Sequence, residues 1–259
     1  CSLRTRQGLE MSSKRIVIVT GGSQNIGLSI ARRFQKSGAT VICADLNPPQ
    51  DNSLNFIATD VSNEASIMAM MDQVEMNFGH LDVLVNNAGI CIETPIQDTT
   101  EQQWDRVMDI NIKGTFLTTK HALRLMKNPA ATAPAIVNIS SIEGLGANPL
   151  HAVYAASKAA VAGFTRNTAL EYGPYGIRCN AVAPGWINTP FNERLLAQYP
   201  DREAVDTEIE ALHPAGRLGV PEDVANTVFW LASTEASFIT GQEIICDGGR
   251  LAKLPLPKL

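Results

Sequence analysis

The sequence predicts an α/β fold in which a parallel sheet is doubly wound, with helices covering both of its faces. Short apolar runs rich in β-branched residues alternate with helix-length stretches from one end of the chain to the other. These runs are apolar throughout, which is typical of strands buried on both faces. The length of 259 residues and the hydrophobic content of 45% are ordinary for one such domain.

Seven strands are expected, each a short run bounded by turn residues or by the start of a helix. RIVIVT is the first, LDVLVNNAG runs from a strand into a loop, and GIRCNAVAPG ends in a Pro-Gly turn. In chain order the strand segments are 15–20, 40–45, 55–60, 81–89, 135–140, 176–185 and 243–249.

Five helices are expected between the strands, at 26–36, 63–78, 101–126, 154–172 and 222–233. Asn63 is a favourable N-cap, and Gly38 and Gly79 are typical helix stops. Pro221 suits the first turn of the last helix. The stretch 101–126 reads as one helix, long enough to bend.

We expect one domain over 14–259, preceded by an extension at 1–13 that is polar and lacks the apolar middle of a secretory signal. The segment 188–215 is polar and bracketed by prolines, so we interpret it as a covering for the substrate, not a second domain. The apolar tail after Gly249 contains two prolines, and the sequence does not decide whether it closes the pocket or packs on a second subunit.

Composition excludes several classes of partner. A formal net charge of −5 and a pI near 5.4 argue against nucleic acid or an anionic membrane as the main partner. No apolar run approaches the roughly 20 residues that span a bilayer. The five cysteines show neither a disulfide framework nor a metal-binding spacing, so we expect no metal and a reducing, cytoplasmic setting.

The first strand–helix turn, TGGSQNIG at 20–27, resembles a dinucleotide-binding turn with an asparagine in place of one glycine. Gly21 and Gly27 would provide the tight turn and the close approach of helix and strand, and the helix N-terminus would face the phosphates. Asn25 is the non-glycine residue that best tolerates positive φ, and it is also a good N-cap. A plain glycine-rich loop is the alternative.

Asp45, at the end of the second strand, favours NAD over NADP. Its carboxylate is placed to accept hydrogen bonds from the adenosine ribose and would repel a 2′-phosphate. No Arg or Lys stands in GGSQ or in the LNPPQ that follows Asp45. The alternative is a residue that only holds a turn. Asp60, at the end of the third strand, is the candidate for contact with the adenine edge.

Tyr154 and Lys158 open a helix at spacing i and i+4, on one face. A phenol titrates near 10, and a neighbouring ammonium together with an oxidised nicotinamide would lower its pKa toward that of a base for an alcohol proton. By itself such a pair is usually a surface or packing feature. Ser141 ends the fifth strand, where its hydroxyl can hold the substrate oxygen. Asn111 lies inside the long helix, where its amide can interrupt the ladder and hold a water.

With Asn86-Asn87-Ala88-Gly89 and Pro184-Gly185, the chain resembles the short-chain dehydrogenase/reductase family over residues 14–250. The resemblance implies a Rossmann fold with a seven-stranded parallel sheet of order 3-2-1-4-5-6-7, usually as a homotetramer or dimer. It also implies that Tyr154 is the general acid/base, that Lys158 binds the nicotinamide ribose, that Ser141 positions the substrate and that Asn111 completes a proton relay.

The cofactor residues expected for NAD are Gly21, Ser23, Gln24, Asn25, Ile26, Gly27, Asp45, Leu46, Asp60, Val61, Asn87, Ala88, Gly89, Tyr154, Lys158, Pro184, Gly185, Ile187 and Thr189. Thr189 would donate to the nicotinamide carboxamide. The departure from the family pattern is Asn25, and it concerns cofactor affinity.

The expected substrate residues are Ser141, Glu143, Asn148, His151, Tyr154, Trp186 and Asn188. Several are polar, and Glu143 is the most informative because a buried carboxylate needs hydrogen-bond donors. A polyhydroxylated substrate would supply them, whereas a salt bridge is the alternative reading. Arg194, Arg202 and Arg217 are candidates to meet an anion, although such arginines are usually just solvated.

These residues favour an NAD-dependent oxidoreductase that transfers hydride between a sugar or polyol hydroxyl and NAD. A steroid-type or 3-oxoacyl reductase is the alternative enzyme. A non-catalytic NAD-sensing protein is the alternative of another class, disfavoured because both Tyr154 and Lys158 are present.

Overall fold

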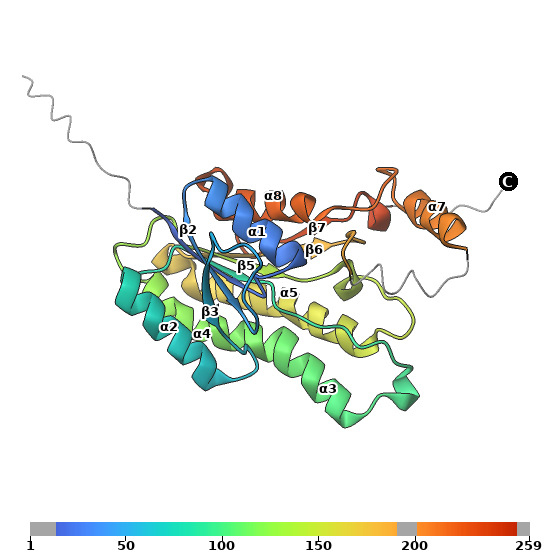
Figure 1. The fold of residues 1–259 in the computed structure, drawn as a ribbon, viewed down its shortest axis with the longest axis horizontal. Helices are drawn as coiled ribbons and strands as arrows, with labels where there is room; N and C mark the ends of the chain where they lie inside the picture. The colour runs from blue at the N-terminus through green and yellow to red at the C-terminus, as the bar shows by residue number, and fades with distance from the viewer. Residues whose placement is uncertain (1–13, 191–200, 253–259) are drawn as a thin grey trace, which may run out of the picture.

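The computed structural model describes residues 14–190 and 201–252. The expected extension 1–13, the middle of the covering segment (191–200, including Arg194) and the tail from 253 onward lie outside the described residues. Seven parallel strands form one sheet in the order β3-β2-β1-β4-β5-β6-β7, as expected (Figure 1). The strands are β1 Ile16–Thr20, β2 Thr40–Asp45, β3 Asn55–Ala58, β4 Val83–Asn86, β5 Ala135–Ile139, β6 Arg178–Pro184 and β7 Glu243–Cys246.

Helices cover both faces of the sheet, with α1 and α8 together on one side and α2, α4 and α5 on the other (Figure 1). The longer helices are α1 Asn25–Lys36, α2 Glu64–Phe78, α3 Glu101–Met108, α4 Gly114–Met126, α5 Ala152–Tyr172, α7 Arg202–Leu212 and α8 Pro221–Ala232. Two separate apolar cores result, one on each face.

Successive side chains along a strand belong alternately to the two cores. Val17 and Val19 pack with α1 and α8, whereas Ile16 and Ile18 pack with α2 and α4. Successive side chains of a strand point to opposite faces, so a strand with helices on both sides must be apolar at every position. This is why β1 reads as IVIVT without a polar residue before its end.

Several helix ends are confirmed. Asn63 caps α2 by accepting a hydrogen bond from Ser66 N, and Gly79 ends that helix in the left-handed region at φ 75°. Pro221 is the first residue of α8. The prediction that Asn25 caps α1 is wrong: Gln24 is the N-cap, in extended conformation, and Asn25 is the first helical residue.

The stretch 101–126 is not a single α-helix. Residues Asp109–Lys113 form a π-helical turn (η2) between α3 and α4. A π-turn accommodates one extra residue in an otherwise α-helical ladder. Within 188–215 the structure also forms α7, which the polar sequence of that segment did not predict.

The order of the strands creates the site. Chain connections leave β1 toward β2 on one side and, after β3, toward β4 on the other. In such sheets the carboxyl ends of the strands at the reversal point frame a crevice for ligands.

Candidate active site

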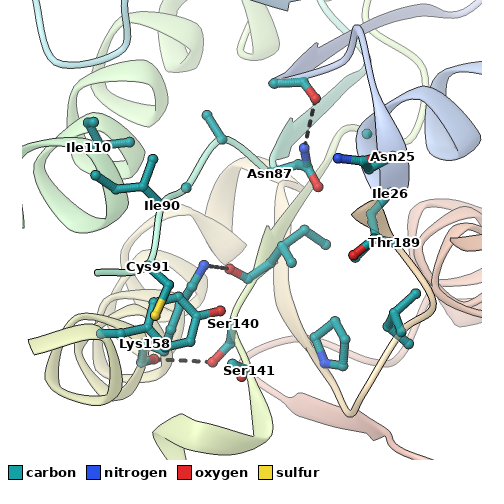
Figure 2. Close-up of a pocket in the computed structure, with 18 of the residues that line it drawn as sticks. Asn25, Ile26, Asn87, Ile90, Cys91, Ile110, Ser140, Ser141, Lys158 and Thr189 are labelled. Atoms are coloured by element: carbon teal, nitrogen blue, oxygen red, sulfur yellow. Dashed lines mark hydrogen bonds between the residues drawn. The ribbon is translucent and has the colours of Figure 1, made fainter. Parts of the chain in front are cut away.

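A cavity of about 530 Å³ opens at the carboxyl ends of the strands. Eighteen of the nineteen expected cofactor residues line it, as do Ser141, Glu143, His151 and Trp186. Figure 2 shows Asn25, Ile26 and Thr189 at one end of this pocket and Cys91, Lys158, Ser140 and Ser141 at the other. The cavity therefore has a glycine-turn end and a Tyr–Lys end.

The glycine-turn end is too tight for side chains. A Cβ on Gly27 would lie 2.0 Å from Gly21 O, and Gly21 itself has φ 61°. Asn87 Nδ2 donates to the carbonyl oxygens of Thr20 and Gly21, at 3.0 Å each, and so fixes the turn from below. Backbone N–H groups at the start of α1 face this narrow space, which suits a pyrophosphate.

Asn25 adopts the glycine-like conformation that its position requires. Its φ is 49°, in the left-handed region, and it lines the cavity. Asparagine enters this region more readily than other side chains except glycine, so the backbone path of the turn is kept.

Ser23 is the expected cofactor residue that does not line the cavity. Its N–H donates to Asp45 Oδ2 at 3.0 Å, and its Oγ is buried with no hydrogen-bond partner among the described residues. The prediction that it contacts the cavity is not met, because it holds the turn from behind.

Asp45 stands at the end of β2 and lines the cavity. Its carboxylate accepts from Ser23 N and Leu46 N, the latter at 2.7 Å. Asp45 therefore does hold the turn, as the alternative expected. A carboxylate can accept about four hydrogen bonds, so two acceptor positions remain for hydroxyl donors. Asp60 likewise lines the cavity while accepting from Ser62 N and Oγ.

At the other end of the cavity, Lys158 is 4% exposed and donates from Nζ to Ile139 O at 2.8 Å. The ammonium lies 5.6 Å from the centroid of the Tyr154 ring. Burial lowers the pKa of Lys158 to about 8. Burial also raises the pKa of the Tyr154 phenol, against a lowering by its hydrogen bond with Ser141. The predicted activation of the phenol is therefore not a property of the chain by itself.

The adjacent serines have different tasks. Ser140 Oγ donates to Lys158 O at 3.1 Å, in the interior, and so ties β5 to α5 (Figure 2). Ser141 faces Tyr154 and accepts from Glu143 N at 3.2 Å. Ser141, the serine expected to hold the substrate oxygen, is thus the one of the two that lies against Tyr154.

Asn111 lies in the π-turn, is 1% exposed, and does not line the cavity. Its side chain accepts from Ile90 N and donates to Ile90 O and Ser157 Oγ, at 2.8–3.0 Å. Both amide protons are therefore used by protein atoms. The side chain therefore braces the loop after β4, and its part in a proton relay stays a prediction.

Glu143 has its donors within the protein. Asn148 Nδ2 donates to Oε1 at 2.8 Å, and His151 Nδ1 lies 2.8 Å from both carboxylate oxygens. His151 Nε2 in turn lies 3.4 Å from Glu93. The argument that this carboxylate needs a polyhydroxylated substrate is wrong, because the hydrogen-bonded alternative is the one the structure shows.

Two expected substrate residues lie outside the cavity lining. Asn148 reaches only Glu143, and Asn188 is exposed with its N–H bonded to Gly219 O. Ile187 pairs with Gly219 in a bridge, so Ile187 and Thr189 face the cavity and Asn188 between them faces away.

The sequence reading missed an apolar wall. Ile90, Ile110, Ile139 and Ile142 line the same cavity as Tyr154 and Ser141. An isoleucine near a strand or helix is expected in the apolar core, and nothing in the sequence shows that these four face a cavity. Cys91 also lines the cavity, and burial with the nearby Glu143 and Glu93 raises its pKa to about 12, so its thiol is not a nucleophile near neutral pH.

Over 14–190 and 201–252, no His, Cys, Asp or Glu cluster is arranged to hold a metal ion. No helix within these residues is both long and apolar enough to cross a bilayer.

Comparison with known proteins agrees with the geometry over nearly the whole chain. A family model described as enoyl-(acyl carrier protein) reductase matches residues 21–250. A cis-4-hydroxycyclohexanecarboxylate dehydrogenase of Sinomonas cyclohexanicum is 39% identical, covering 94% of this chain and 99% of its own. A cyclopentanol dehydrogenase of Comamonas testosteroni is 37% identical, covering 92% and 97%. Among solved structures, an aldohexose dehydrogenase of Thermoplasma acidophilum has TM-score 0.90 at 37% identity, covering 95% and 97%.

Proposed function

The chain belongs to the short-chain dehydrogenase/reductase family of oxidoreductases acting on CH–OH groups, and from that premise we propose that it oxidises a secondary hydroxyl on a small ring with NAD. The observation that carries the proposal is the convergence of Ser141, Tyr154 and Lys158 at one end of a cavity whose other end is a glycine turn.

The mechanism assigns one task to each of these side chains. NAD, when bound, supplies the acceptor for the hydride that leaves the alcohol carbon. Ser141 donates to the substrate oxygen. The ammonium of Lys158 and the positive charge of an oxidised nicotinamide would lower the pKa of Tyr154, so that its phenolate form takes the proton of the alcohol. Lys158 keeps one ammonium proton on Ile139 O and offers the others toward the nicotinamide ribose. Asn111 positions the loop that carries Ile90, which lines the cavity.

NAD is favoured over NADP by Asp45. Its carboxylate lines the cavity, and no basic residue accompanies it in 21–24 or 46–50. A 2′-phosphate placed there would meet an uncompensated negative charge.

A ring alcohol is favoured by the cavity walls and by the relatives. Isoleucines and Trp186 contribute apolar side chains to the cavity that Tyr154 also lines, which suits a compact apolar substrate. Three similar proteins are named for a cyclohexane, a cyclopentane and an aldohexose substrate, all of them rings. Sugars stay within this proposal as rings, although Glu143 no longer argues for them.

The experiment is the initial rate of NADH formation over a panel of cyclic alcohols, aldoses, polyols and hydroxyacyl compounds. We expect ring alcohols to react fastest, and Tyr154→Phe to lower kcat by about 100-fold or more while NADH still binds. Substantial turnover by this variant would contradict the assignment of Tyr154. Turnover confined to hydroxyacyl compounds would contradict the ring proposal and leave the reductase alternative.

A further inference from the structure

Glu143, His151 and Glu93 form a row of titratable side chains, and the first two line the reaction cavity. Nδ1 of His151 lies 2.8 Å from both carboxylate oxygens of Glu143, and Nε2 lies 3.4 Å from Oε1 of Glu93. The side chains of Glu143, His151 and Glu93 are 11%, 12% and 28% exposed. The imidazole ring is therefore held between two carboxylates and largely out of water.

The backbone holds this row in place at the start of α5. Leu150, which precedes His151, has φ 71°, in the left-handed region that a leucine rarely adopts. Its carbonyl oxygen accepts from Thr94 N at 3.0 Å, which joins the loop that carries Glu93 to the residue before the imidazole. A strained residue that is retained at such a point indicates that the direction of the His151 side chain is needed.

The hydrogen bonds of the row favour a positive charge on His151. A neutral imidazole has one donor nitrogen and one acceptor nitrogen. If Nδ1 donates its proton to Glu143, a neutral ring turns the lone pair of Nε2 toward the carboxylate of Glu93. An imidazolium donates at both nitrogens, so it is the form that suits both carboxylates.

This charge matters because the row lies against the tyrosine that is proposed as the base. The rings of His151 and Tyr154 meet edge to face, with centroids 6.2 Å apart. Burial is the main cause of the raised pKa of Tyr154, and the charges of Cys91 and Glu143 raise it further. The thiol of Cys91 is neutral near neutral pH, so Glu143 contributes the negative charge that opposes a phenolate there.

Other cations also lie near the phenol and the row. The ammonium of Lys158 is 5.6 Å from the centroid of the Tyr154 ring. Arg250, after β7, is close enough to Glu143 for their charges to interact. Among the described residues, His151 is the cationic side chain that pairs directly with the Glu143 carboxylate. A charge that is paired in this way repels its surroundings less than an unpaired one.

We propose that His151 is a positioning residue for the reaction, which balances the charge of Glu143 so that Tyr154 can exist as a phenolate. His151 then acts through Glu143 and needs no contact with the substrate. The inference rests on the proposed function for the identity of the base, whereas the balance of charge concerns only the residues around Tyr154.

The test is the pH dependence of kcat for oxidation of the fastest alcohol of the panel with NAD. His151→Gln keeps an amide that can donate to Glu143 but removes the cation, so the acidic limb of the profile should move to higher pH by about one unit. Glu143→Gln should move this limb to lower pH, and the double variant should return it close to the wild-type position. A purely structural role would lower kcat in each variant without moving the limb.

His121→Gln is the matched control. Nε2 of His121, on α4, lies 2.8 Å from Oε1 of Glu64, so this variant removes a histidine from a similar pair in another part of the fold. The limb of this variant should coincide with that of the wild type. A limb that moves equally in both histidine variants would contradict a specific role for His151.

A measurement without turnover separates the two proposals. The ultraviolet absorbance of phenolate, taken with NAD bound and as the difference from Tyr154→Phe, reports the ionisation of Tyr154 directly. Its midpoint should move to higher pH in His151→Gln, as the limb does. A shifted midpoint together with substantial turnover by Tyr154→Phe would leave the charge balance standing and overturn the proposed function. A midpoint that His151→Gln and Glu143→Gln leave unchanged would overturn the role of His151.

Discussion

At the scale of single residues, the chemistry of the site depends on charges taken out of water. Lys158 is almost fully buried, yet within the described residues its ammonium donates to one carbonyl oxygen only, that of Ile139. Tyr154 is held in its protonated form by burial. Positive charge from an oxidised nicotinamide beside the phenol would favour its phenolate form. The site is thus built for the bound state at a cost to the free protein.

Lys158→Met should therefore stabilise the free protein while abolishing turnover. The fall of the Lys158 pKa from 10.5 to about 8 corresponds to roughly 3 kcal/mol of unfavourable burial. Below pH 8 lysine is charged in both the folded and unfolded states, and the cost is complete. Between pH 8 and about 10.5 the folded state has lost the proton that the unfolded state keeps, so wild-type stability rises with pH relative to the variant.

Thermal melts of both proteins from pH 7 to 10, without cofactor, measure this difference. The variant should melt higher by a constant amount from pH 7 to about pH 8, and its advantage should then shrink toward pH 10. An advantage that does not change with pH would mean that Lys158 packing, and not its charge, determines the effect.

Asp45 permits a test of cofactor choice. Asp45→Ala combined with Leu46→Arg should shift the ratio of kcat/KM for NAD over NADP by about 100-fold or more toward NADP, because a repulsion is replaced by a charge-assisted contact. Asp45→Asn keeps the shape and the acceptor for Ser23 N, so it isolates the charge. Unchanged selectivity in the double variant would refute the ribose role.

At the scale of the elements, the ends of strands and helices position the site. The glycine turn joins β1 to α1, Asp45 ends β2, Ser141 follows β5, and Tyr154 and Lys158 share one face of α5. These placements could be predicted, because strand periodicity and turn residues are local in the sequence.

Other features of the site depend on contacts between distant segments and could not be predicted. The sequence did not predict the hydrogen bonds that Asn111 makes with Ile90 and Ser157. No residue pattern around Asn111 predicted the π-turn either. Glu143 was predicted to await a substrate because its partners Asn148 and His151 follow in a loop of no regular period.

The turn before α1 provides a test at this scale. Asn25→Val should weaken NADH binding about tenfold or more, because a β-branched residue at positive φ costs about 1–2 kcal/mol and would distort the turn. Asn25→Gly, the matched control, should bind NADH at least as tightly as the wild type. Fluorescence titration with NADH measures both. Weaker binding by the glycine variant would show that the Asn25 side chain itself contacts the cofactor.

At the scale of the whole molecule, helices α4 and α5 carry large apolar side chains that are exposed to solvent. Phe116 on α4 is 47% exposed, and its ring meets that of Phe164 on α5 with centroids 6.2 Å apart. Leu170, also on α5, is 77% exposed. Exposed aromatic side chains that meet across two neighbouring helices are typical of a protein interface. We propose that α4 and α5 pair with a second subunit in a homotetramer or dimer.

Phe116→Asp should then lower the molar mass measured by light scattering, because a buried unpaired charge opposes association. Met76→Asp is the control: Met76 is as exposed as Leu170 but lies on α2. A mass unchanged by the Phe116 variant would rule out this face as the interface.

The π-turn of Asp109–Lys113 has a consequence for the phase of the helix that contains it. One surplus residue turns everything before it by about 100° relative to everything after it. The directions in which Trp104 and the fully buried Val107 point therefore depend on the extra residue of the π-turn that follows them. Deleting one residue from this turn would restore an ordinary α-helix and rotate α3 about its own axis. The deletion lies beside the reaction cavity, but its main effect would be on the packing of α3, one helical turn away.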